Sequence, residues 1–73
     1  MTIHCFNIKY EIAEEALAVM KEIGFEPVFI TELLISPDED EVSEFVADPV
    51  NFITRTISGV NDFPVASFDF EVL

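Results

Sequence analysis

The stretch "TIHCFNIKYEIAEEALAVMKEIG" (residues 2–24) changes its hydrophobic period halfway along, and this change decides the predicted fold. Residues 2–10 are rich in aromatic and β-branched side chains, which is typical of a strand. One face of it would carry Phe6, Ile8 and Tyr10, and the other Ile3, Cys5, Asn7 and Lys9. Residues 11–24 instead place Ile12, Ala16, Val19, Met20 and Ile23 at helical spacing, and Gly24 stands where the helix would end.

The second predicted strand is "FEPVFITELLIS" (residues 25–36). Two strands joined through a helix by short connections favour parallel pairing. Pro27 has no amide hydrogen, so the strand should begin after it or lie at a sheet edge there. Both faces are apolar, with Val28, Ile30 and Leu34 on one of them. This pattern indicates a strand buried on both sides, or a sheet face that meets a partner.

A strong helix-start signal follows in "ISPDEDEVSEFVADPV" (residues 35–50). Ser36 is the predicted N-cap, Pro37 the first helical residue, and Glu39 the residue that completes a capping box. Residues 37–58 are predicted to form either one helix kinked at Pro49 or two short helices.

The end of the chain is predicted to be a turn followed by a strand. The turn is "GVND" (residues 59–62), and residues 63–73 alternate between apolar and polar side chains. The inward residues of this last strand would be Ala66, Phe68, Phe70 and Val72.

The element order is therefore β-α-β-α-β in a chain of 73 residues, which is too short to close a second core. We predict a single compact domain over residues 1–73, in the α/β (α+β) class. Its form would be a small β-α-β-α-β sandwich with an about three-stranded mixed sheet and two or three helices on one face, loosely ferredoxin-like in arrangement. A sheet face left uncovered, bearing Val28, Ile30 and Leu34, would favour a homodimer or docking.

The net charge of the chain limits the kinds of molecule that it can bind. Fifteen Asp and Glu stand against three Lys and Arg, which gives a net charge of −12. Such a chain repels phosphate, so direct binding to nucleic acid or to an anionic membrane is disfavoured, and basic proteins are the expected partners. Adaptation to high salt would also produce acidity, but the eight Phe argue against it. No apolar run approaches the ~18 residues of a membrane span, and the N-terminus lacks a signal-peptide pattern, so we expect a cytoplasmic protein.

Chemical signatures are sparse, and we predict no enzyme, cofactor or dedicated metal site. Cys5, the one cysteine, lies in an apolar stretch and is best interpreted as a buried thiol. His4, the one histidine, is its neighbour on a strand, so the two side chains point to opposite faces and cannot form a catalytic dyad. Two glycines are too few for a phosphate-binding loop. The "DEDEVSE" run lacks the glycine and the final acid of a calcium loop.

The acids of residues 35–50 divide into two groups. Asp38 and Glu39 are explained by the predicted helix start, where negative charge complements the helix dipole. Asp40, Glu41, Glu44 and Asp48 would form a band along one side of the helix. Residues 22–54 contain no basic side chain that would compensate this band, although a solvated helix face remains the simplest explanation of it.

Two functions remain open. In size, acidity and compactness the chain resembles small nucleic-acid mimics, many of them phage proteins that block host nucleases, restriction systems or CRISPR complexes. On this resemblance the four-residue band would dock on a basic, nucleic-acid-handling protein and inhibit it, in the host cytoplasm if the protein is phage-encoded. The alternative is a small structural or regulatory subunit that dimerises or docks through apolar sheet surface, its acids serving solubility.

Overall fold

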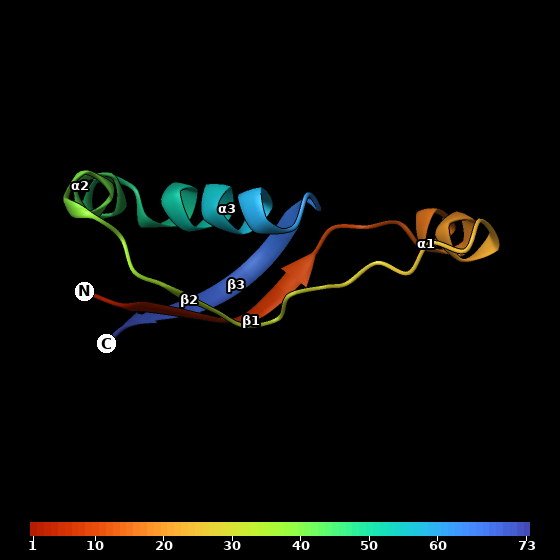
Figure 1. Ribbon diagram of the computed structural model, residues 1–73, viewed down its shortest axis with the longest axis horizontal. Helices are drawn as coiled ribbons and strands as arrows, with labels where there is room; N and C mark the ends of the chain where they lie inside the picture. Colours follow the sequence, from red (N-terminus) through yellow and green to blue (C-terminus); the bar gives the residue numbers. More distant parts are fainter.

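The fold is organised around a central strand, β1 (Ile3–Tyr10). The computed structural model describes residues 1–73 and places β1 between β2 (Leu33–Ile35) and β3 (Val65–Val72), in the order β2-β1-β3. Both neighbours run antiparallel to β1, and both chain termini lie at one end of the molecule (Figure 1). The small α+β class is confirmed, whereas parallel pairing of the first two strands, and with it a mixed sheet, is wrong.

An irregularity in β1 decides which of its side chains reach the core. Asn7 has a φ of 53°, and the pairing with β3 shifts register after Phe6 and again after Lys9. The alternation of faces is interrupted there, so Ile8 lies in the core together with Ile3 and Cys5. The predicted face of Phe6, Ile8 and Tyr10 is therefore wrong, because a strict period of two assumes an uninterrupted strand.

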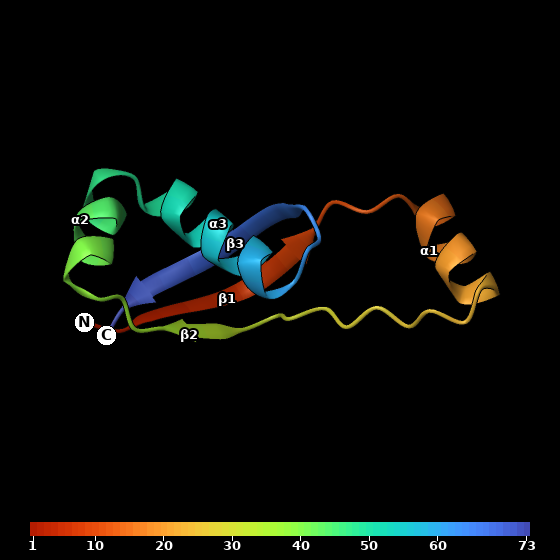
Figure 2. The ribbon, with the colours of Figure 1, turned by 45° about the horizontal axis from the view of Figure 1, so that its top comes forward.

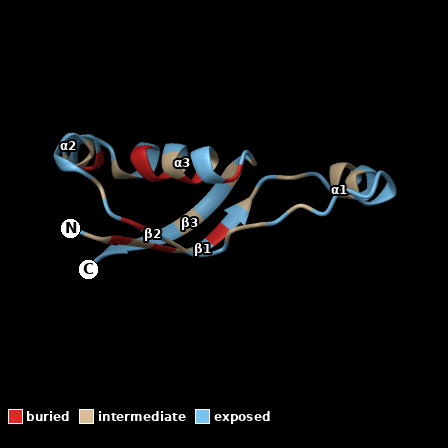
Figure 3. Ribbon diagram, viewed as in Figure 1, coloured by how far each residue is buried: buried red, intermediate tan, exposed pale blue.

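Two short helices, α2 (Glu39–Ala47) and α3 (Pro49–Val60), cover one face of the sheet (Figure 2). The question of one kinked helix or two is thereby answered, because the backbone of Asp48 leaves the helical region between them. Figure 3 shows that the buried residues gather where α3 meets the strands. The core cluster consists of Ile3, Cys5, Ile8, Ile35, Phe45, Phe52, Ile53 and Ile57.

The segment between β1 and β2, residues 11–32, is here called the arm. Most of it leaves the sheet, and its last residues return beside β1, where the amide of Ile8 donates to the carbonyl of Thr31 at 3.3 Å. The arm contains α1 (Glu14–Glu22), which has no buried residue and stands beyond the end of β1 (Figure 1). The long axis of the molecule is consequently 44 Å, against 18 and 16 Å for the others. Its radius of gyration is 14.1 Å, where about 11 Å is usual for 73 residues.

The arm explains two errors in the predicted fold. Because α1 does not cross over the sheet, the chain travels out and returns, and β2 meets β1 antiparallel. The predicted strand of residues 25–36 is reduced to Leu33–Ile35, the rest being the extended return of the arm. Gly24 does end the helix as expected. It has a φ of 78°, and the amide of Phe25 donates to the carbonyl of Met20 in a Schellman-type arrangement.

The bulge in β1 can be tested at Asn7. We expect Asn7→Val to lower the free energy of unfolding by about 1–2 kcal/mol, because a β-branched side chain is strained at positive φ. Asn7→Gly should stay within about 0.5 kcal/mol of wild type, since glycine accepts this conformation. Urea unfolding followed by circular dichroism measures both. Equal losses for the two variants would show that the side-chain hydrogen bond from Asn7 to Asp69, and not the backbone, matters there.

Candidate functional site

The acidic segment begins with a capping box at Asp38. The Asp38 carboxylate accepts from the amide of Glu41 at 2.9 Å, and the Glu41 carboxylate accepts from the amide of Asp38 at 3.3 Å. The predicted start, with Ser36 as N-cap and Glu39 as its partner, is wrong by two residues. Both pairs have the spacing of three that a capping box requires, so spacing alone could not choose between them.

Asp48 performs a structural task between the two helices. Its carboxylate accepts from the amide of Asn51 at 3.2 Å and caps the start of α3, where Pro49 occupies the first turn. Glu44 pairs with Arg55 at 3.4 Å, which links α2 to α3 across an exposed surface. Such an exposed pair adds little stability, but it does neutralise one charge.

The four predicted binding residues therefore differ in their surroundings. Glu41, Glu44 and Asp48 each make an intramolecular contact, and Asp40 alone makes no hydrogen bond or ion pair. Three members of the band thus have a structural contact within the chain. A capping carboxylate keeps its charge, however, and Asp40, Glu44 and Asp48 are exposed. Their role in partner binding stays a prediction.

The uncovered face of the sheet carries a polar cluster that the sequence did not reveal. His4 on β1 lies between two carboxylates, with Nε2 at 2.5 Å from Glu32 and Nδ1 at 3.2 Å from Glu71. Its ring stacks on Phe6 with centroids 5.0 Å apart. The hydrogen bonds to Glu32 and then to Glu71 raise the pKa of His4 above its usual 6.5. The imidazole side chain is 23% exposed, and its two contacts link β1 to β3 and to the residue that precedes β2 on the outer face.

Cys5 occupies a different environment on the opposite face. Its side chain is fully buried in the core, and desolvation raises the pKa of the thiol, which disfavours the reactive thiolate. His4 and Cys5 thus lie on opposite sides of the sheet, as the strand geometry predicts. No group of three or more His, Cys, Asp or Glu side chains is placed to hold a metal ion.

The base of the arm is held by an aromatic and polar cluster. Tyr10, Phe29 and Phe63 have ring centroids 5.1 to 6.4 Å apart. Asn61, the one buried polar residue, donates to the Tyr10 hydroxyl at 3.3 Å and to the Val28 carbonyl at 3.0 Å. The predicted turn at residues 59–62 is wrong in its first half, because α3 continues to Val60, and Asn61 at its C-terminal end fixes where the arm leaves the body.

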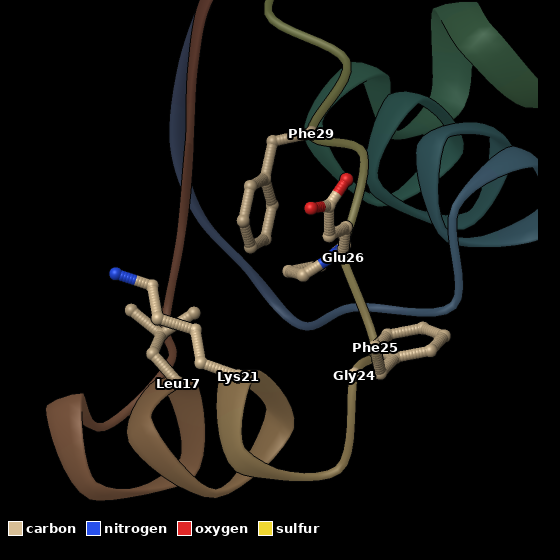
Figure 4. A pocket seen from close by; sticks show the side chains of 7 residues that line it. Leu17, Lys21, Gly24, Phe25, Glu26 and Phe29 are labelled. Carbon is tan, nitrogen blue, oxygen red and sulfur yellow. The ribbon is translucent and has the colours of Figure 1, made fainter.

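Beyond this base, α1 and the returning chain enclose an open pocket of about 610 Å³ (Figure 4). Its lining is Leu17, Lys21, Gly24, Phe25, Glu26, Pro27 and Phe29. A second hollow of about 300 Å³ shares Leu17 and Phe29 with it and continues towards β1. The arm is thus a second candidate interaction surface, more apolar than the acidic helix.

No protein-family model, curated protein or solved structure matches the chain. No helix is both long enough and apolar enough to cross a membrane. The candidate surfaces therefore rest on the geometry of the chain itself.

Protonation of His4 gives a prediction with a defined sign. Because its pKa is raised by folding, the stabilisation is fully present below the unfolded pKa of 6.5 and is lost as the pH rises through the higher folded pKa. The single histidine gives its own NMR signals, and we expect a titration midpoint above 6.5. Glu32→Gln should lower this midpoint more than Glu71→Gln, and Glu39→Gln on α2 should leave it unchanged. A wild-type midpoint at or below 6.5 would contradict the cluster.

The cap at Asp48 provides a second prediction. Asp48→Ala should lower the free energy of unfolding by about 1 kcal/mol, whereas Asp48→Asn should cost only a few tenths, because the Asn oxygen still accepts from the Asn51 amide. Asp40→Ala is the control, since Asp40 caps nothing. Urea unfolding distinguishes the three. If Asp48→Asn were as damaging as Asp48→Ala, charge and not the cap would be the cause.

Proposed function

We propose that this protein is a non-enzymatic acidic binding protein, a nucleic-acid mimic that docks on a basic nucleic-acid-handling protein and inhibits it. The observation that supports this most is the linear density of charge. A net charge of −12 along an axis of 44 Å is one negative charge for every ~3.7 Å. A single nucleic-acid strand carries about one for every 3.4 Å.

The acidic helix α2 is the part of the surface best suited to this role. Six carboxylates lie within residues 38–48, and Arg55 is the one basic side chain paired with them. Their capping contacts hold several of these charges in fixed positions, so a partner would meet an ordered array. A field of this sign would speed association with a basic groove, and the effect would fall with salt. We place this activity in the cytoplasm, the host's if the protein is phage-encoded.

A structural or regulatory subunit that docks through apolar surface is the second candidate. The observation that favours it is the exposure of Val28 (78%) and Leu34 (62%), two residues of the apolar run predicted to meet a partner. Leu34 lies in β2, but Val28 belongs to the arm and not to a sheet face. An apolar docking surface on this chain would therefore centre on the arm.

The acidic band can be neutralised without removing its caps. In the variant Asp40→Asn, Glu41→Gln, Glu44→Gln, Asp48→Asn the amide oxygens still accept the capping hydrogen bonds, while four charges are lost. A bacterial lysate is bound to immobilised duplex DNA at roughly 50 mM salt and washed with this protein. We expect wild type to release specific basic proteins and the band variant to release several-fold less.

The matched control removes four charges from the arm, with Glu11, Glu14, Glu15 and Glu22 each changed to Gln. Its net charge equals that of the band variant, so it should release proteins nearly as well as wild type if the position of the charges matters. Equal release by both variants would exclude the band as the docking surface. No release by wild type would contradict the proposed function.

A further inference from the structure

We propose that the arm binds a long-chain carboxylate, with the aliphatic chain in the two hollows beside α1 and the carboxylate at Lys21. Such a site is separate from the acidic band and needs no docking partner. The hollows of about 610 Å³ and about 300 Å³ share Leu17 and Phe29, so together they form an elongated groove from Gly24 to Tyr10, here called the arm groove. Each volume lies within the ~300–1,000 Å³ that is usual for ligand pockets.

The walls of the arm groove are apolar and come from three parts of the chain. Leu17 belongs to α1, Phe29 to the returning chain and Ile8 to β1. The side chains of Leu17 and Phe29 point towards each other across the larger hollow (Figure 4). Phe25, which also lines this hollow, is 50% exposed. An aliphatic chain in the groove would remove part of this apolar surface from water, which favours binding.

Two of the three Lys and Arg side chains of the protein line the arm groove. Lys21 lines the larger hollow and Lys9 the smaller one. Neither forms an ion pair, although the chain contains fifteen Asp and Glu, whereas Arg55 is paired with Glu44. A lysine can lay its aliphatic stem along apolar surface while its ammonium group stays at the rim. The groove therefore combines an apolar body with positive charge that has no partner within the chain.

The acids nearest to the arm groove do not pair with these lysines. Glu26 lines the larger hollow, but its carboxylate and the Lys21 amino group lie on opposite sides of the Phe29 ring (Figure 4). Glu14 lies on the same face of α1, two turns before Lys21, and outside the lining. The carboxylates of residues 38–48 are at the other end of the 44 Å axis, far beyond the ~8 Å over which charges interact at physiological salt. The local charge of the groove thus favours an anionic head group, although the net charge of the chain favours a cationic one.

Two probes with the same aliphatic chain and opposite charges test this site. The intact, isotope-labelled protein is titrated with dodecanoate and with dodecylammonium at neutral pH and about 0.15 M salt, below the concentration at which either forms micelles. The amide signals of Leu17, Gly24 and Phe29 are followed by NMR. We expect dodecanoate to shift these signals in a saturable manner and to bind about threefold or more tightly than dodecylammonium. Attraction to the charge of the whole chain would give the reverse order.

Substitution of the lysines identifies the head-group contact. Lys21→Gln should weaken dodecanoate binding about threefold or more, and Lys21→Arg should retain it. Lys9→Gln should act in the same direction with a smaller effect, because it removes the positive charge of the second hollow. Arg55→Gln is the matched control, since it removes the same charge from α3 and should leave binding unchanged. All three side chains are exposed, so the fold should persist, and circular dichroism checks this.

Each outcome decides the proposal. Dodecanoate binding that Lys21→Gln weakens and Arg55→Gln leaves unchanged supports it. Tighter binding of dodecylammonium at the same three signals overturns it, as does an equal loss in Lys21→Gln and Arg55→Gln. The absence of a saturable shift with dodecanoate up to about 1 mM also overturns it. Release of proteins from DNA by the Lys21→Gln variant should equal that by wild type, so the ligand site and the acidic band are tested separately.

Discussion

The fold depends on a single constraint, which is that only one face of the three-stranded sheet is covered. Every core residue of the strands must therefore point to the same side, towards α2 and α3. The positive φ of Asn7 makes this possible, because it turns Ile8 to the side already occupied by Ile3 and Cys5. Without this interruption Ile8 would face away from the helices, and the core would lose one of its eight members.

The sequence predicted elements whose signal is local, and it failed where the position of an element depends on packing. Residues 63–73 form β3 (Val65–Val72), and Gly24 ends α1 as its position indicates. Of the residues predicted to point inward on β3, only Phe68 is partly buried, and Ala66, Phe70 and Val72 are exposed. The parallel pairing was wrong because the crossover rule assumes that the intervening helix packs on the sheet. Helical periodicity shows that α1 has an apolar stripe, but it does not show what the stripe contacts. The apolar residues 25–32 likewise indicated a buried strand, although they form the return of an arm.

In the candidate site, too, the sequence predicted the local features but not those that depend on packing. The sequence placed six carboxylates near a helix start, but the capping box has two possible registers, Ser36 with Glu39 and Asp38 with Glu41, and their spacing does not choose between them. The cluster around His4 could not be predicted from the sequence. It joins residues 4, 32 and 71, which become neighbours through the strand order β2-β1-β3. Its carboxylates become neighbours only because both edge strands run antiparallel to β1. No local pattern carries that information.

The two candidate surfaces are compatible because they lie at opposite ends of the long axis. The acidic helix α2 is at the end that holds the termini, and α1 is at the other (Figure 1). Residues 11–32 contain six carboxylates and one Lys, and residues 38–48 contain six carboxylates, so the negative charge is divided between the two ends. The two ends lie well beyond the ~8 Å over which charges interact at physiological salt, so each would attract a basic partner independently of the other.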